Sequence, residues 1–282
     1  MVTVGELVQV MERLAPRCLA ETWDNPGLHV GSPEWPVKLI WVALDPTQGL
    51  IQQAVDNHVN LVITHHPLIF RPLYSVDLGT QPGRIIELAL KNQVALLCAH
   101  TNLDSARGGV NDMLAEKVGL KSFEVLKPVE NSRCREVVND LYPVHGHSEM
   151  EGLGRIGNLP EPISFEALVD RIKKEFALST VKTAGNPVQD VRRIAVCGGS
   201  GRSLLGDFLR SDADVFISGD MGYHDGQQVA DLGKGLIDIG HFSSEHVMVE
   251  GLARQLSTCL ASTEHDVAVV PFSGEKDCFR YL

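Results

Sequence analysis

The chain has 282 residues, of which 44% are hydrophobic and 22% charged, so it can bury a core in one large α/β domain or two smaller lobes. Its net charge of −11 argues against sequence-independent binding to nucleic acid, which depends on dense Lys and Arg. No apolar run reaches the roughly 18 residues that a membrane-spanning helix needs. The N-terminus lacks the basic start and apolar run of a signal peptide, so we expect a soluble cytoplasmic protein.

The six cysteines form no C-x-x-C pair. Cys98 and Cys197 lie within apolar, strand-like runs, where a thiol usually packs as a small hydrophobic group. This pattern is typical of a reducing compartment, and it predicts no disulfide framework.

The first part of the chain alternates between amphipathic and continuous apolar segments. Thr3 and Glu6 have the spacing of a capping box, which predicts a helix over residues 3–15. The same patterns predict the following elements: helices at 48–58, 82–92 and 110–118, and strands at 39–44, 60–64 and 94–99. Such alternation is typical of a mostly parallel sheet with helices on its faces.

Residues 127–190 are interrupted by glycine and proline, and Ser164 then begins an amphipathic helix through Phe176. The alternation resumes as follows: strands at 192–197, 214–217, 235–239, 266–271 and 277–281, and helices at 202–210, 225–232 and 243–258. We therefore predict an α/β fold of two lobes with mixed, mostly parallel sheets flanked by helices. The lobes are placed at 1–126 and 127–282, and the C-terminal helix and strands could pack on either lobe.

Three apolar runs end at residues with metal-ligand chemistry. Strand ends of an α/β sheet are where ligands collect. Taken singly, each group has an ordinary alternative, such as a hydrogen-bonded histidine pair, a turn-forming aspartate or a helix-capping pair. Together they supply three imidazoles and two carboxylates, which predicts a binuclear metal site formed by His65, His66, Asp104, His241 and Glu245.

The donor set suits Zn, Fe, Mn or Co, and the spacing does not choose among these metals. His241 and Glu245 are four residues apart at an expected helix start, so both can face one site, and Glu245 can bridge two ions. Two metals about 3.5–4 Å apart polarise a substrate oxygen and generate hydroxide near neutral pH. The set therefore predicts a metal-dependent hydrolase with metal-bound hydroxide as the nucleophile. By the predicted lobe boundary, His65, His66 and Asp104 belong to the first lobe, and His241 and Glu245 to the second.

Several other residues near strand ends are secondary candidates. Asp220 and His224 could act as general base or proton shuttle, or could orient a ligand. His100 is expected to support the site rather than to ligate. The segment 198–201, Gly-Gly-Ser-Gly, could cradle an anion with its amides or could form a tight turn. The loop 23–28 is either a turn or a wall near the site.

These motifs resemble the Nif-three-like family, whose members are often named GTP cyclohydrolase 1 type 2 homologues. The resemblance covers nearly the whole chain and rests on these segments: Glu21–Leu28, Ala43–Asp45, Thr64–Pro67, His100–Asp104, Gly152–Gly157, Ala195–Gly201, Ser218–Asp220, Tyr223–His224, and Gly240–His241 with Glu245. It implies a two-lobed α/β fold, a homohexameric ring, and a di-metal site that faces an internal cavity. The five residues named above match the family's metal ligands, with Glu245 as the bridging one.

The resemblance also implies an activity, the hydrolytic opening of a purine nucleotide ring by attack at C8, although the sequence contains no purine-reading motif. The alternative is a metal-binding adaptor or regulatory protein that acts through protein interactions, since the family's name comes from such an interaction. The chain lacks the central domain of longer members. The segment 134–150 matches the family less well, and its His145 and His147 have no assigned role.

Overall fold

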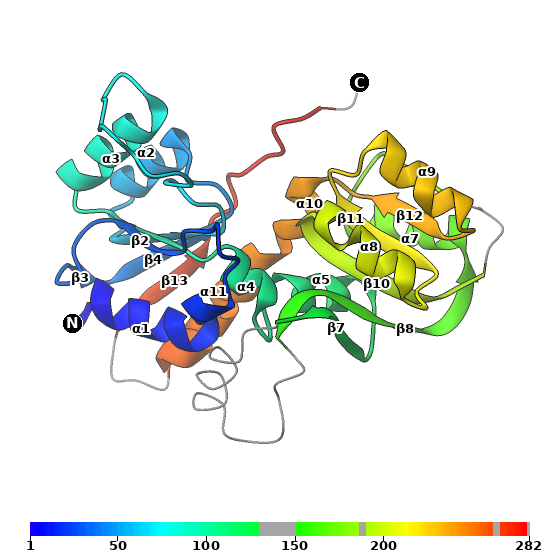
Figure 1. Cartoon of the computed structure of the whole chain (residues 1–282). Helices are drawn as coiled ribbons and strands as arrows, with labels where there is room; N and C mark the ends of the chain where they lie inside the picture. Colours follow the sequence, from blue (N-terminus) through cyan, green and yellow to red (C-terminus); the bar gives the residue numbers. More distant parts are fainter. Residues whose placement is uncertain (130–150, 186–189, 262–265, 281–282) are drawn as a thin grey trace. The chain divides into compact units, whose positions relative to one another are not determined.

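A computed structural model of the chain describes residues 1–129, 151–185, 190–261 and 266–280, and divides it into two compact units (Figure 1). The first unit comprises Met1–Leu103 and Met248–Lys276, and the second comprises Asp104–Val247 and Asp277–Leu282. The sequence places the boundary at 126/127, whereas the structure places it at 103/104, because the helix after residue 110 packs in the core of the second unit. Asp104 therefore belongs to the second unit.

The first unit is built on a five-stranded sheet in the order β13-β4-β5-β6-β2. All neighbouring strands run parallel except β2, which pairs antiparallel with β6. A separate two-stranded ladder joins β1 and β3. The strands are β1 (Val2–Thr3), β2 (Gly27–Val30), β3 (Pro36–Val37), β4 (Leu39–Ala43), β5 (Leu61–Thr64), β6 (Ala95–Cys98) and β13 (Ala268–Pro271).

Helices cover both faces of this sheet (Figure 1). They are α1 (Val4–Leu14), η1 (Arg17–Leu19), α2 (Gln48–Asp56), α3 (Gln81–Lys91) and α11 (Val247–Ala261), while the short helix α4 (Thr101–Ser105) spans the unit boundary. Thr3 caps α1, and Glu6 completes the capping box, as the sequence predicts. Buried residues of α2 and α3 pack against sheet residues such as Val62 and Leu96.

The end of the chain completes the first unit, a choice that the sequence left open. Strand β13 pairs in parallel with β4, and the ring of Phe272 stacks on Trp41 with centroids 5.1 Å apart. The Glu275 carboxylate accepts the backbone N–H groups of Leu44 and Asp45 at 2.8–2.9 Å. Residues far apart in sequence therefore hold the carboxyl end of β4.

The second unit is built on a six-stranded sheet in the order β7-β8-β10-β11-β12-β9. The central strands β10, β11 and β12 run parallel, and the outer pairings are antiparallel, so this sheet is mixed. Its strands are β7 (Phe123–Pro128), β8 (Gly152–Ser164), β9 (Lys182–Ala184), β10 (Asp190–Ser200), β11 (Val215–Gly219) and β12 (Gly235–Asp238).

Alternate residues of these strands bury two different cores. Ile194 and Ile217 join the core that holds α5 and α7, whereas Ala195 and Phe216 join the core that holds α8. Helices therefore lie on both faces of the sheet. The helices are α5 (Val110–Val118), α7 (Phe165–Glu175), η3 (Gly201–Leu204), α8 (Leu205–Arg210), α9 (Tyr223–Asp231) and α10 (His241–Glu245).

Arg155, on β8, is buried in the second unit and has a full set of acceptors. Its guanidinium donates to the Asp112 carboxylate on α5 and to the carbonyl oxygens of Gly152, Gly154 and Ala106. A buried charge is tolerated when it is paired and hydrogen-bonded in this way. The arginine therefore fastens α5 to the glycine-rich start of β8.

The structure differs from the sequence predictions at one helix, one strand and one cysteine. The expected helix 243–258 is two helices, and the first begins at His241 because Gly240, at φ +84°, turns the chain and accepts the N–H of Ser244. Residues 277–280 form no strand. Cys18 is disulfide-bonded, so the expectation of no disulfide is wrong there, whereas Cys98, Cys197 and Cys278 have free thiols.

None of the helices in the described part of the chain combines the length and apolar character that crossing a bilayer demands. The segment 134–150, with His145 and His147, lies outside the described residues.

Candidate metal centre

Three histidines of the first unit gather where β5 and β6 end. His65 and His66 follow β5 directly, and His100 comes two residues after β6. The ring centroids of His65 lie 5.2 Å from those of His66 and 5.1 Å from those of His100. One nitrogen from each ring lies within 4.8 Å of the other two, a spacing that suits one metal ion. We call these three residues the histidine cluster.

The first two imidazoles of this cluster are held by their Nδ1 atoms. His65 Nδ1 lies 2.9 Å from the carbonyl oxygen of Ala99, and His66 Nδ1 lies 2.7 Å from Asp45 Oδ1. Such acceptors fix the tautomer in which Nδ1 carries the proton and Nε2 can bind a metal. Asp45 is itself held through its backbone N–H by Glu275.

His100 is held in the same way by Asp24, a residue that the sequence analysis did not single out. Nδ1 of His100 lies 2.8 Å from Asp24 Oδ1, and Thr101 donates to Asp24 Oδ2 through both its amide and its hydroxyl. Burial raises the pKa of Asp24, but the bonds from His100 and Thr101 outweigh it and lower the pKa to about 2. The structure therefore places a third imidazole beside His65 and His66 and fixes its orientation.

Three further candidate ligands belong to the second unit, and we call Asp104, His241 and Glu245 the carboxylate cluster. His241 and Glu245 are the first and last residues of α10, and His241 Nε2 lies 3.0 Å from Glu245 Oε2. Buried oxygens of Asp104 and Glu245 lie within 4.8 Å of each other. Two buried carboxylates at this distance repel, and a divalent cation would remove the repulsion. The donor set therefore fits a metal.

Gly199 makes room for this cluster. Its φ is +62°, and a Cβ atom there would lie 2.0 Å from Glu245 Oε1 and 3.3 Å from His241 Nε2. The amide of Gly199 donates to Ser244 Oγ at 2.9 Å, so it is used inside the protein. Of the two readings of segment 198–201, the structure favours a tight backbone approach over an anion cradle.

The two catalytic candidates of the sequence are placed differently. Asp220, which follows β11 at φ +56°, has Oδ2 2.7 Å from Nδ1 of His241 and so orients that imidazole. His224 is exposed on α9, where its ring packs against Tyr223 and its Nδ1 lies 3.4 Å from Gln227 Oε1. Asp220 is thus a positioning residue by geometry. Within the described part of the second unit, the contacts of His224 with Tyr223 and Gln227 do not link it to a candidate ligand.

The chain is similar to known proteins over nearly its whole length. A family model described as Duf34/NIF3 (NGG1p interacting factor 3) matches residues 2–277. The chain belongs to this family. Among curated relatives named "GTP cyclohydrolase 1 type 2 homolog", the NIF3-family chain is 31% identical to one from Clostridium perfringens, with 99% of both chains covered. It is 33% identical to one from Streptomyces coelicolor, over 90% of this chain and 85% of that protein.

Solved structures of NIF3 proteins have the same fold. A Bacillus cereus protein related to NIF3 superposes with a TM-score of 0.88 at 25% identity, covering 99% of each chain. A Staphylococcus aureus hypothetical protein gives a TM-score of 0.88 at 29% identity, with 100% of this chain and 99% of that chain covered. The two-lobed α/β architecture is therefore that of the family.

Proposed function

We propose that this NIF3-family protein holds two divalent metal ions and uses them for hydrolysis. The proposed ligands are His65, His66, Asp104, His241 and Glu245, with Glu245 as the bridging carboxylate. The observation that carries the proposal is the shared orientation of His65, His66 and His241. Each has Nδ1 beside a carbonyl or carboxylate oxygen, which leaves Nε2 as the ligand atom.

Zn, Fe, Mn or Co would suit this donor set, and when bound would supply Lewis acidity at the substrate and activate water. The chain's own residues position the ligands. Asp45 and Asp220 each accept the Nδ1 proton of one imidazole, so both rings present Nε2 in a fixed direction. Gly199 leaves the space that the Glu245 carboxylate occupies.

The proposed substrate is a purine nucleotide whose imidazole ring is opened by water at C8. Support comes from the relatives named "GTP cyclohydrolase 1 type 2 homolog". In this proposal His224, which is exposed, transfers protons to or from the substrate. Asp220 acts through His241 and does not touch the substrate.

An exposed apolar loop favours a second function, binding to another protein. Large hydrophobic side chains lie on the surface between β5 and α3: Phe70, Leu73, Tyr74, Val76 and Leu78. The exposed ring of Trp23 packs edge-on against Phe70 with centroids 5.7 Å apart. Clustered exposed apolar groups mark interaction surfaces. The loop supports self-association into the hexameric ring that the family resemblance implies, and it equally supports an adaptor role.

Metal content per chain, measured by mass spectrometry after reconstitution with Zn, Fe, Mn or Co, tests the ligand set. We expect about two ions in the wild type and a clear loss in both His66→Ala and Glu245→Ala, because each removes a ligand. His224→Ala is the matched histidine control and should keep the full metal content. A reconstituted wild type without metal would contradict the proposal.

Incubation of the metal-loaded protein with GTP tests the reaction. Ring opening should remove the purine absorption band and add the mass of one water to the nucleotide. Glu245→Ala should abolish turnover, and His224→Ala should slow it about 100-fold or more while keeping the metal. A fully loaded protein that leaves GTP unchanged would reject this substrate and favour the binding function.

A further inference from the structure

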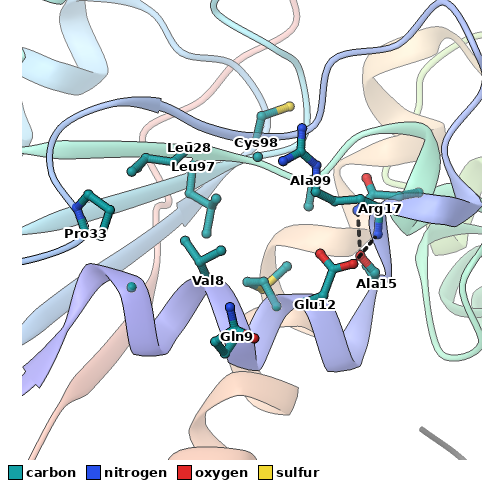
Figure 2. A pocket seen from close by; sticks show the side chains of 14 residues that line it. Val8, Gln9, Glu12, Ala15, Arg17, Leu28, Pro33, Leu97, Cys98 and Ala99 are labelled. Carbon is teal, nitrogen blue, oxygen red and sulfur yellow. Dashed lines mark hydrogen bonds between the residues drawn. The ribbon is translucent and has the colours of Figure 1, made fainter. Parts of the chain in front are cut away.

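A cavity of about 280 Å³ lies in the first unit between α1 and the strands β2 and β6 (Figure 2). Val8 and Met11 on α1, with Leu28 and Leu97 on the strands, form its apolar walls. In Figure 2, Pro33 lies at one end of the cavity, and Arg17 and Glu12 lie at the other. A small, mostly apolar pocket with a few polar groups is the usual form of a small-molecule site.

The first polar group of the cavity is a cation that is free to take a ligand. The Arg17 guanidinium forms no ion pair within the part of the chain that the structure describes. Gly27, at φ +125°, lets the guanidinium approach, because a Cβ there would lie 3.3 Å from Arg17 Cζ. An arginine that is not engaged by the protein favours a carboxylate, which it can bind with two parallel hydrogen bonds.

The second polar group is an orphaned acceptor. Asn102, 3% exposed, donates from Nδ2 to the carbonyl oxygen of Ala15 at 2.7 Å, whereas its Oδ1 is buried and accepts no hydrogen bond from the described residues. Buried polar atoms normally have a partner, so an unpartnered acceptor in a cavity wall calls for a donor from a ligand. Glu12, which accepts the amide of Arg17, adds a negative charge beside it.

The remaining walls are uncharged. Burial raises the pKa of the Cys98 thiol well above its usual range, so this side chain stays neutral. Ala99 also lines the cavity, and its carbonyl oxygen accepts from His65, so the cavity and the histidine cluster share a wall. The polar side chains that line the cavity, apart from the neutral thiol, are thus one cation, one carboxylate and the amides of Asn102 and Gln9.

We infer that this cavity binds a small apolar carboxylic acid that carries a hydrogen-bond donor on its α carbon, an α-amino or α-hydroxy acid. Arg17 binds the carboxylate, Asn102 Oδ1 accepts from the α substituent, and Glu12 favours a positively charged one. The aliphatic part of the ligand lies against Val8 and Leu97. Binding here does not depend on the proposed hydrolysis.

Matched probes, tested on the full chain, separate the contribution of the ligand's carboxylate from that of its α substituent. L-leucine carries both polar groups, 4-methylpentanoate lacks the α substituent, and 3-methylbutylamine lacks the carboxylate. Methyl NMR titrations should show L-leucine shifting the signals of Val8, Leu28 and Leu97, with the other two probes binding at least about tenfold more weakly. The acid 2-hydroxy-4-methylpentanoate should bind between L-leucine and 4-methylpentanoate, because it donates without a charge.

Variants of the lining residues test whether L-leucine binds in this cavity. Arg17→Gln should weaken L-leucine binding about tenfold or more, and Val8→Phe should abolish it by filling the cavity. The control Arg13→Gln lies on α1, as Val8 does, but outside the cavity lining, so this variant should bind L-leucine as the wild type does. Thermal melts confirm that each variant is folded. Absence of binding by all four probes at millimolar concentration, or L-leucine binding unchanged in both Arg17→Gln and Val8→Phe, would overturn the inference.

Discussion

Asp24 illustrates what a single residue contributes to the candidate centre. It lies in a loop 76 residues before His100, and its side chain is inaccessible to solvent. Its two oxygens accept from the His100 ring and from the amide and hydroxyl of Thr101. Because these donors favour the ionised form, the carboxylate contributes stability that the unfolded chain lacks.

Asp24→Asn should therefore reduce the free energy of unfolding by about 1.5–3 kcal/mol at neutral pH, the usual worth of hydrogen bonds to a charged group. The folded pKa of Asp24 is lowered from 3.8 to about 2, so this stability is fully present above pH 3.8 and is lost as the pH falls from there toward 2. Urea unfolding measured from pH 7 down to pH 2 follows this loss. Asp56→Asn, on the exposed face of α2, should change little, and equal losses in the two variants would refute the role of Asp24.

At the scale of elements, the end of β10 and the helix α10 approach each other because Gly199 has no side chain. The glycine adopts φ +62°, and its amide bonds to Ser244 on α10. The same helix carries His241 and Glu245 one turn apart. The strand-to-helix packing thus decides where two candidate ligands lie.

Gly199→Ala should displace Glu245 and His241, because its Cβ would lie 2.0 Å from Glu245 Oε1. We expect at least a tenfold loss of metal affinity, together with about 1–3 kcal/mol of destabilisation from the left-handed backbone. Gly233→Ala is the matched control, since its φ is +67° and nothing lies within 4 Å of the added Cβ. It should cost stability only, and metal titrations with thermal melts distinguish the two outcomes. Equal metal affinity in both variants would contradict the steric argument.

At the scale of the whole molecule, the first unit is assembled from both ends of the chain. Strand β13 extends its sheet beside β4, and Phe272 fills the core against Trp41. Such pairing between distant segments closes a long loop, so this unit is complete only when almost the entire chain is present.

Phe272→Ala should destabilise the first unit by about 3–5 kcal/mol, the usual cost of emptying a buried aromatic site. All three tryptophans, at positions 23, 35 and 41, belong to this unit, so their fluorescence during urea unfolding measures it selectively. The control is Phe279→Ala, because Phe279 is 70% exposed and its loss should change stability by about 0.5 kcal/mol or less. A tryptophan transition that is unchanged in Phe272→Ala would show that β13 is dispensable.

Local sequence patterns predicted the elements well. The capping box at Thr3, the helix start at Ser164 and the apolar strands before His65 and His241 all appear in the structure. These features are encoded within a few residues, by side-chain periodicity and by capping hydrogen bonds. The residue types expected to bind metal could therefore be located, since they follow those strands.

Long-range packing decided the features that join distant parts of the chain. No local pattern indicates that Asp104 lies beyond the unit boundary or that β13 pairs with β4. The hydrogen bond between Asp24 and His100 likewise joins residues far apart in sequence. The sequence by itself determined which segments become strands and helices, and which donor atoms stand at their ends. Only the tertiary structure decided which of those ends lie together, because that depends on how buried faces fit and on which polar groups satisfy one another.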